Sequence, residues 1–380
     1  MVVRYCSGGL ILLSLVSASA IAAVEAPSSN APSFRFARPG YVFSFPRDHA
    51  AHPAFRTEWW YYTGQLAAEG DSLAPADLGF QLTFFRRGVA RPDPPRPSAW
   101  ALRDVYFAHL AVSDLAGRRF HFAERMSRGA LGSAGTDSTT YRVWIDDWQA
   151  TLAADGSQRL TASEPGSHAI DLRLVPRKPP ALHGEAGLSR KGATAEQASH
   201  YYSITRLDAE GTVRLGARTL QVRGEAWMDH EFSTGDLAPN LVGWDWFGLQ
   251  LDDGSELMLY VLRRADGVPD PASSGSLVDR DGRVTHLPIE KFTVDVVRRW
   301  KSSKTGASYP ASWRIRIPGA GIELAVEPRL DDQELVTAAS TGITYWEGAV
   351  SVNGSRSGAP VRGRGYVELT GYTEPFREKM

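Results

Sequence analysis

Near its middle the chain reads Gly224-Glu225-Ala226-Trp227-Met228-Asp229-His230-Glu231-Phe232-Ser233, at the end of a run rich in β-forming residues. Because side chains alternate along a strand, Trp227, Asp229 and Glu231 would share one face and the residues between them the other. Acids beside a large aromatic side chain are costly to bury unless they are paired. The pattern is that of a pocket wall or, equally, of a half-exposed strand whose acids lie in water.

The same period of two recurs from residue 57 to residue 372, and turn residues separate the runs. Asp-Gly pairs at 155–156, 253–254 and 281–282 are hairpin signals, because glycine supplies the positive φ that tight turns need. We find no convincing helical period beyond the N-terminus. Many strands with short turns indicate an all-β protein, either a barrel or a sandwich.

The N-terminus has the layout of a secretory signal peptide. Arg4 precedes an apolar run at residues 10–16, and small residues with usable cleavage sites follow it. An uncleaved anchor is the alternative, although the run is short for a membrane span. We therefore predict a signal peptide at 1–23 and an extended lead-in at 24–48, which places the mature protein outside the cytoplasm, secreted or periplasmic.

Composition narrows the class of protein further. The 380 residues carry a formal net charge of -1, which argues against a nucleic-acid partner. The single cysteine, Cys6, lies in the predicted signal peptide, so the mature chain would have no disulfide and no thiol nucleophile. A Gly- and Pro-containing break at 235–240 precedes a restart of strands at Val242, and we predict two domains, 49–235 and 236–380.

Common catalytic motifs do not occur in the sequence: there is no Gly-x-Ser-x-Gly elbow, no His-Glu-x-x-His and no phosphate-binding loop. His49 and His52 form the one close histidine pair, in a Pro-flanked segment that we interpret as a solvated loop rather than a metal site. We therefore predict neither a cofactor nor a metal.

Two aromatic runs indicate a binding site. Residues 57–66 read Thr-Glu-Trp-Trp-Tyr-Tyr-Thr-Gly-Gln-Leu, and residues 243–247 read Gly-Trp-Asp-Trp-Phe. So many aromatic side chains exceed the needs of a closed core, and their polar tips need partners. They predict a cavity for an apolar ligand or, equally, an aromatic contact surface between domains. The predicted ligand-binding residues are Glu58, Trp59, Trp60, Tyr62, His109, His230, Glu231, Trp244, Asp245 and Trp246.

Two of these residues have alternative interpretations. Asp245 shares its strand face with apolar residues, so it would be either paired with an arginine such as Arg263 or Arg264, or held neutral by burial. His109 lies between Phe107 and Ala111 in a β-rich run, where a hydrogen-bonded core histidine is the better interpretation.

A catalytic set follows from the order of the strands. His200 and Tyr202 share one face of a run that precedes the central stretch by a single hairpin-like excursion. Strands consecutive in sequence are often neighbours, so we expect this pair to meet Trp227 and Asp229. An acid beside apolar walls, a histidine and aromatic faces suit protonation of an unactivated double bond followed by addition of water. We predict Asp229 as proton donor, His200 as its partner, and Tyr202 with Trp227 as walls.

Five motifs carry a family resemblance: His52-Pro53-x-Phe55-Arg56-Thr57-Glu58-Trp59-Trp60-Tyr61-Tyr62-Thr63-Gly64, Gln81-Leu82-Thr83-Phe84-Phe85-Arg86, Ala226-Trp227-Met228-Asp229-His230-Glu231-Phe232-Ser233, Gly243-Trp244-Asp245-Trp246-Phe247 and Tyr345-Trp346-Glu347-Gly348. Together they resemble the AttH family of secreted lipocalin-like proteins, over about residues 52–372. Members have been labelled predicted secreted hydrolases. The family is similar to carotenoid 1,2-hydratases, and the resemblance implies two consecutive lipocalin-like antiparallel β-barrels with a ligand pocket near their junction.

The hydratase pattern is His-x-Trp followed by Tyr-x-Asp, and its nearest positions here are His200-x-Tyr202 and Trp227-x-Asp229. The aromatic residues are exchanged, which argues against carotenoid hydration itself and leaves open an acid-assisted reaction on an apolar substrate.

We predict an exported protein that binds an apolar, lipid- or isoprenoid-like small molecule and acts on it as a hydratase, hydrolase or isomerase. The first alternative is a non-catalytic carrier or accessory factor of an envelope transport system of the ABC type. The second is a structural protein whose aromatic strands only join its two halves.

Overall fold

The structure, a computed structural model, describes residues 34–69, 77–89, 98 and 100–376. The predicted signal peptide at 1–23 and the first part of the predicted lead-in lie outside these residues. Within them the secondary structure is almost all strand, with only short 3₁₀ turns, η1 (Arg47–His49), η2 (Ala130–Gly132), η3 (Ile289–Lys291) and η4 (Pro318–Ala320). None of the described helices has the length and apolar character needed to cross a membrane.

Thirteen of the described strands form one antiparallel sheet, sheet A. They are β1 (Thr57–Ala68), β2 (Leu78–Gly88), β3 (Asp104–Asp114), β4 (Arg119–Ser127), β5 (Ala134–Thr136), β6 (Arg142–Ile145), β7 (Trp148–Leu152), β8 (Gln158–Ser163), β9 (His168–Pro176), β10 (Ala181–Leu182), β11 (Leu188–Arg190), β12 (Ala198–Leu215) and β13 (Arg218–Ser233). The strand order is β4-β3-β2-β1-β13-β12-β9-β8-β7-β6-β5, with β10 and β11 also paired to β12.

The other ten described strands form sheet B, which is also antiparallel. They are β14 (Leu241–Leu251), β15 (Glu256–Arg264), β16 (Ser274–Val278), β17 (Val284–Pro288), β18 (Thr293–Lys301), β19 (Ser308–Ile317), β20 (Ile322–Pro328), β21 (Glu334–Val336), β22 (Thr344–Arg356) and β23 (Ala359–Thr370). The strand order is β17-β16-β15-β14-β23-β22-β20-β19-β18, with β21 also paired to β22.

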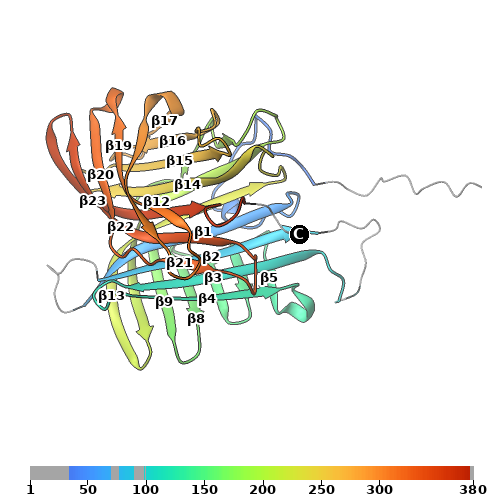
Figure 1. Cartoon of the computed structure of the whole chain (residues 1–380). Coiled ribbons are helices and arrows are strands. Elements are labelled where there is room, and N and C mark those ends of the chain that lie inside the picture. The colour runs from blue at the N-terminus through green and yellow to red at the C-terminus, as the bar shows by residue number, and fades with distance from the viewer. Residues whose placement is uncertain (1–33, 70–76, 90–97, 99, 377–380) are drawn as a thin grey trace, which may run out of the picture.

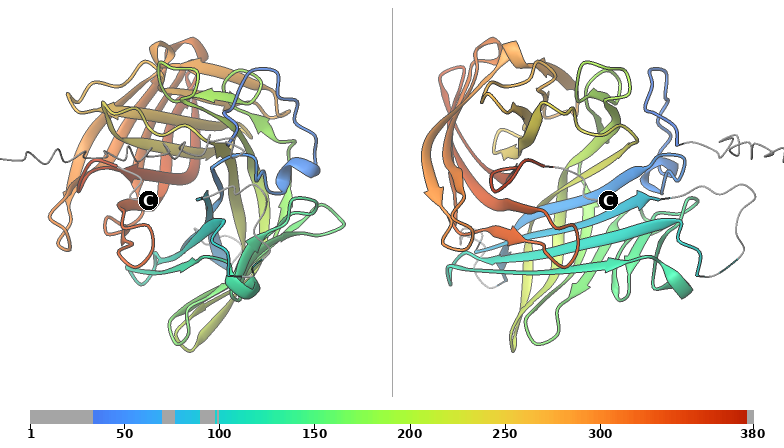
Figure 2. Two further views of the ribbon diagram at one scale, coloured as in Figure 1. Left: turned by 90° about the vertical axis from the view of Figure 1, so that its right-hand side faces the viewer. Right: turned by 45° about the vertical axis from the view of Figure 1, so that its right-hand side comes forward.

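Each sheet curls around its own core, so the predicted fold class of two antiparallel β-barrels is confirmed (Figure 1). Sheet A forms a nearly closed barrel, in which Arg125 of β4 donates a hydrogen bond to the carbonyl of Ile145 in β6 at 3.3 Å. Sheet B forms a half-barrel, mostly yellow to red in Figures 1 and 2. The predicted Asp-Gly turns hold, because Gly156, Gly254 and Gly282 all have positive φ.

Strand alternation divides each sheet into a core face and a contact face. In β1 the side chains of Trp60, Tyr62 and Leu66 enter the core of barrel A, while Trp59 and Tyr61 point toward sheet B. The core of barrel B is built in the same way, from residues such as Phe247, Leu249, Trp313 and Trp346. The stretch that is aromatic on both faces therefore serves both a core and a contact between barrels.

Buried polar groups fix the barrels against each other. Gln65 of β1 donates hydrogen bonds to two backbone carbonyls of sheet B at 2.8 Å, and Gln250 of β14 donates to two of sheet A at 2.8 and 2.9 Å. Glu256 of β15 is fully buried and pairs with Lys178 and Arg206, each at 2.7 Å. The chain passes from sheet A to sheet B between Ser233 and Leu241, and the division into two domains at residue 236 stays a prediction.

Candidate functional site

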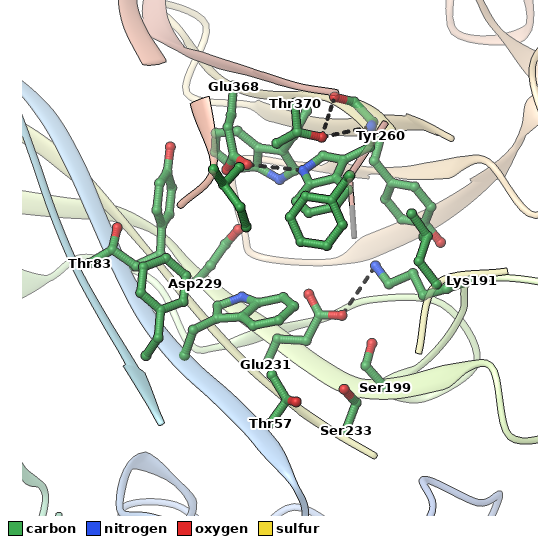
Figure 3. A pocket seen from close by; sticks show the side chains of 18 of the residues that line it. Thr57, Thr83, Lys191, Ser199, Asp229, Glu231, Ser233, Tyr260, Glu368 and Thr370 are labelled. Atoms are coloured by element: carbon green, nitrogen blue, oxygen red, sulfur yellow. Dashed lines mark hydrogen bonds and ion pairs between the residues drawn. The ribbon is translucent and has the colours of Figure 1, made fainter. Parts of the chain in front are cut away.

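A cavity of about 240 Å³ lies between the contact faces of the two barrels (Figure 3). One side of the cavity, called the floor, belongs to sheet A and is formed by β1, β2, β3, β12 and β13. The opposite side, called the roof, belongs to sheet B and is formed by β14, β15, β22 and β23. Because directly paired residues of neighbouring strands point to the same side, the strand registers show which side chains stand in a row.

The first floor row is polar. Register places His109, Thr83, Tyr61, Asp229 and Ser203 side by side across five strands. All but Ser203 line the cavity, and Ser203 is fully buried behind Asp229. The direct neighbours of Asp229 in this row are therefore the hydroxyl-bearing residues Tyr61 and Ser203.

The second floor row is mainly aromatic. It consists of Phe107, Phe85, Trp59, Glu231 and Tyr201, all of which line the cavity. Its one charged member, Glu231, forms an ion pair with Lys191 at 3.3 Å. The sheet A side of the cavity therefore consists of one polar row and one mainly aromatic row of side chains.

The roof repeats this mixture of aromatic and acidic groups. Tyr260, Trp246, Glu368 and Glu347 form one row across sheet B, with Glu368 directly opposite Glu347 in the pairing of β22 with β23. A second row contains Leu262, Trp244, Thr370 and Tyr345. Figure 3 shows Glu368 and Tyr260 above Asp229 and Glu231.

Asp229 is held by three hydrogen bonds. Its carboxyl oxygens accept from Tyr201 Oη at 2.6 Å, from Trp227 Nε1 at 2.6 Å and from Ser203 Oγ. Burial raises the pKa of Asp229 to about 7, although the three hydrogen bonds oppose this shift. No ion pair to Asp229 occurs among the described residues. The carboxyl group can thus carry a proton near neutral pH.

A hydrogen-bonded chain leads from Asp229 to the other barrel. Ser203 Oγ contacts His183 Nε2 at 2.6 Å, and His183 Nδ1 contacts Ser276 Oγ of β16 at 2.9 Å. Burial lowers the pKa of His183 to about 3, so its imidazole is neutral. Because Ser203 donates its hydroxyl proton to Asp229, His183 would donate from Nε2 and accept from Ser276. In each of these three hydrogen bonds the donor then lies on the side away from Asp229 and the acceptor on the side nearer to it.

The two roof carboxyl groups also favour the protonated form. Burial, together with the charge of Glu368, holds the pKa of Glu347 well above its usual range. Burial raises the pKa of Glu368 to about 8, and the charges of Asp229 and Glu231 raise it further. Glu347 Oε1 accepts from Tyr61 Oη at 2.6 Å, and Glu368 accepts from Trp244 Nε1 at 3.1 Å.

The predicted catalytic residues are divided between the two faces of sheet A. Strands β12 and β13 are neighbours, as expected, but His200 and Tyr202 point into barrel A, where they stand opposite Phe232 and His230. Trp227 lies behind Asp229, to which it donates a hydrogen bond. The expected meeting of His200 and Tyr202 with Asp229 is therefore wrong.

A β-bulge between Ile204 and Leu207 is the physical reason. Between the hairpin and Leu207, β12 and β13 pair in one regular register. If that register continued along the strands, Ile204 would stand opposite Asp229, and His200 and Tyr202 would share its face. The bulge inserts one extra residue in β12, so that Ser203 faces Asp229 instead. Tyr201 and Ser203 therefore lie on the face of Asp229, where we expected His200 and Tyr202.

The predicted ligand-binding residues divide in the same way. Those on the cavity wall are Trp59, His109, Glu231, Trp244 and Trp246. Inside barrel A, away from the cavity, lie Glu58, Trp60, Tyr62 and His230; Asp245 faces the core of barrel B. These five residues do not line this cavity, because the core face of a strand and its contact face alternate, and their role in ligand binding stays a prediction.

The alternatives for Asp245 and His109 are resolved by their contacts. Asp245 pairs with Arg263 at 2.8 Å, and burial nevertheless raises the pKa of Asp245, so both interpretations describe part of its environment. His109 is buried, with Nδ1 at 2.8 Å from Tyr345 Oη and Nε2 at 2.9 Å from Ser340 Oγ. It is a hydrogen-bonded buried histidine that also forms part of the cavity wall.

A second group of titratable residues fills one end of barrel A. Glu58 accepts hydrogen bonds from His52 Nδ1 at 2.8 Å and His230 Nε2 at 2.9 Å, and pairs with Arg86 at 3.2 Å. The ligating atoms of His52, Glu58 and His230 lie within 4.8 Å of one another, a spacing that suits a metal. Direct hydrogen bonds already join them, and Arg86 supplies the positive charge, so we interpret the group as an ion-pair network.

Several residues of the cavity were not predicted as site residues: Tyr61, Lys191, Tyr201, Glu347 and Glu368. A signal existed for Glu347 alone, because it stands in the motif Tyr345-Trp346-Glu347-Gly348 and alternates with a large aromatic residue. The others come from segments far apart in the sequence, and only the packing of the two barrels brings them to one cavity.

Comparisons with known proteins agree with this architecture. A family model described as AttH-like matches residues 36–372. A crystal structure of a Nitrosomonas europaea protein assigned to AttH is 37% identical, with a TM-score of 0.80, covering 89% of this chain and 99% of that one. Kievitone hydratase from Nectria haematococca is 14% identical, with a TM-score of 0.67 over 90% of this chain and 96% of that one, and it shares the fold. No curated protein matches the sequence.

Proposed function

Because the chain belongs to the AttH-like family, we propose that it binds an apolar ligand in the cavity between its barrels and acts on it by acid catalysis, as a hydratase or hydrolase. Two observations support a hydratase-like role: the fold is shared with kievitone hydratase, and the cavity combines acids with aromatic walls. We further propose that the protein acts after export, in the periplasm or outside the cell.

The observation that carries the proposal is the environment of Asp229. Asp229 forms part of an aromatic cavity wall and is only 5% exposed as a residue, and its carboxyl group accepts three hydrogen bonds. Since its pKa is raised to about 7, a proton is available at neutral pH. A carboxylic acid of this kind can transfer a proton to a carbon–carbon double bond or to a leaving oxygen.

Hydration would proceed in two steps, protonation of the double bond and addition of water. The proton of Asp229 adds to one carbon of the double bond, whose electron pair forms the new C–H bond, and the other carbon becomes a cation. The faces of Trp59, Trp246 and Tyr61 shelter that positive charge. Water then forms the C–O bond and returns a proton to the Asp229 carboxylate. One alkene and one water give one alcohol, and the acid is restored.

The hydrogen bonds from His183 to Ser203 and from Ser203 to Asp229 support the catalytic role proposed for Asp229. While Asp229 is ionised, the donors aimed at it stabilise the carboxylate and hold its orientation. These groups act through Asp229 and do not line the cavity themselves, so we assign them a positioning role.

The alternative function is a carrier, or an accessory factor of an envelope transport system, that uses the cavity for binding alone. The two proposals differ in the need for a transferable proton. A carrier needs the apolar walls, whereas an enzyme also needs Asp229 in its protonated form.

A labelling experiment separates the two functions. Trisubstituted isoprenoid alkenes and kievitone are incubated with the protein in ¹⁸O-water, and alcohols that carry one ¹⁸O are sought by mass spectrometry. Asp229→Asn should abolish product and keep ligand uptake, while the control Asp208→Asn, at a half-buried site on β12 that pairs with Arg177, should keep both. Ligand uptake by the wild-type protein without labelled product from any of these alkenes would favour the carrier.

A further inference from the structure

Three carboxyl groups of the cavity share an unusual feature: Asp229, Glu347 and Glu368 form no ion pair with any described residue. The ammonium group that faces them from the cavity wall, Lys191, is already paired with Glu231 at 3.3 Å. Buried carboxyl groups are normally paired with cations or satisfied by hydrogen bonds. This cavity therefore has an excess of acidic groups that the described protein does not neutralise.

One of these acids has an unsatisfied oxygen. Glu347 is 1% exposed, and Tyr61 donates to its Oε1, but its Oε2 has no hydrogen-bond partner among the described residues. A buried polar atom without a partner costs free energy, and such atoms are rare outside functional sites. Since Glu347 lines the cavity, the group that satisfies Oε2 can come from a ligand.

The walls around these acids suit a positive charge. Trp59, Trp244, Trp246 and Tyr61 line the cavity, and the rings of Tyr61 and Trp246 meet edge to face at 5.2 Å. Aromatic faces attract cations, most strongly where water is excluded. The protein already uses this interaction here, because the Lys191 ammonium lies 4.0 Å from the ring centre of Tyr260.

We propose that the cavity binds apolar cations, that is, ligands in which a quaternary or protonated amine is joined to an apolar body, more tightly than neutral molecules of the same shape. The proposal rests on the proposed function for the location of the site. It also deepens that function, because a site selective for a fixed cation is complementary to the positive charge that develops during protonation of a double bond.

Binding of a cation should release protons, because it favours the ionised form of the neighbouring carboxyl groups. The charged and titratable groups that line this cavity are Tyr61 on β1, Arg86 and Arg87 on β2, His109 on β3, Tyr201 on β12, Asp229 and Glu231 on β13, Asp236 after β13, Tyr260 on β15, Tyr345 and Glu347 on β22, Glu368 on β23, and Lys191 after β11. Arg86 is already paired with Glu58 and Asp104, and Arg87 with Asp236. Asp229, Glu347 and Glu368 are the acids with raised pKa values, so the released protons should come from them.

The test uses two probes that differ only at one atom, benzyltrimethylammonium and its carbon isostere neopentylbenzene. Binding to the full-length protein is followed by tryptophan fluorescence, and by calorimetry in two buffers with different heats of ionisation. We expect the cation to bind about tenfold more tightly, with release of protons near pH 7. Neopentylbenzene binding as tightly as the cation would overturn the inference and leave the proposed function standing, whereas failure of both probes to bind would contradict both.

Variants identify the acids involved. Glu347→Gln and Glu368→Gln should each reduce the preference for the cation at least threefold and leave neopentylbenzene binding unchanged. The matched control is Glu290→Gln, an exposed site in η3 beyond the cavity. Thermal unfolding verifies that each variant is folded. An unchanged cation preference in both folded cavity variants would contradict the assignment.

Discussion

Glu58 and Asp229 belong to paired strands and are both buried, but their environments differ. Glu58 points into barrel A, where histidines and Arg86 contact it, and these partners hold its pKa well below its usual range although burial opposes this. Asp229 points into the cavity, where burial raises its pKa to about 7. The comparison shows that burial alone does not decide the charge of an acid. The face of the strand decides which partners it has.

The largest expected effect is the loss of the cation beside Glu58. Arg86→Met removes the ion pair with Glu58 at 3.2 Å, a second ion pair with Asp104 at 2.9 Å, and two hydrogen bonds to the carbonyls of His52 and Phe55. Because a buried carboxylate then loses its counter-charge, we expect the free energy of unfolding to fall by about 3–5 kcal/mol in denaturant titration.

The control for this prediction is Arg159→Met, which breaks an exposed pair with Asp171 and should cost less than about 1 kcal/mol. Adding Glu58→Gln to Arg86→Met should recover part of the stability. Equal losses in the two arginine variants would remove the distinction between the charge network of barrel A and a surface pair.

Trp59 and Trp60 are adjacent in β1 but lie on its opposite faces, so substituting each of them tests whether the face of the strand decides the role of a side chain. Trp60 is 1% exposed inside barrel A, and its Nε1 donates to the carbonyl of His49 at 3.1 Å, so Trp60→Ala should cost about 3–5 kcal/mol of unfolding free energy. Trp59 lines the cavity, so Trp59→Ala should cost less than about 1.5 kcal/mol and weaken binding of neopentylbenzene about tenfold. Reversed effects in chemical unfolding and fluorescence titration would contradict the assignment of faces.

The free energy of unfolding should depend on pH in a way that reveals the raised pKa of Asp229. Its folded pKa lies above the unfolded value, so the folded state holds more protons between about pH 4 and 7, and stability falls as the pH rises through that window. Asp229→Asn removes this effect. Relative to wild type, the variant should be equally stable near pH 4 and gain on the order of 3 kcal/mol by pH 7.5. A stability difference independent of pH would contradict the raised pKa.

The smallest expected effect concerns the chain through His183. His183→Phe removes the donor to Ser203, so the carboxylate of Asp229 loses support and its pKa should rise by about 1 unit. His183→Gln keeps a donor and should restore most of the wild-type value. The pKa is read from the pH dependence of the carboxyl infrared band. Identical values in wild type and both variants would exclude the positioning role.

Much of the fold was predictable from local patterns. Period-two alternation predicts the strands, Asp-Gly pairs predict the turns at Gly156, Gly254 and Gly282, and the all-β class follows from both. Alternation also predicts that Trp227, Asp229 and Glu231 share a face, which the structure places against sheet B. These features depend on residues close together in the sequence.

The composition of the site depends on register and on packing between distant segments. One extra residue in β12, at the bulge near Thr205 and Arg206, moves His200 and Tyr202 to the opposite face from Asp229, and the local pattern does not reveal it. Glu347 and Glu368 join the cavity only because sheet B packs on sheet A. Local alternation places Trp227 and Glu231 on the same strand face as Asp229, but it does not reveal Tyr201 and Ser203, which donate hydrogen bonds to Asp229, or the acids Glu347 and Glu368 of the other barrel.

The most direct test is an infrared titration of the carboxyl groups, with Asp229→Asn subtracted from wild type to assign the band. A protonated carboxyl band of Asp229 that persists at pH 6 and disappears with a midpoint near pH 7 is the predicted result. A midpoint near pH 4, the ordinary range of an aspartic acid, would contradict the claim that the cavity holds a protonated acid.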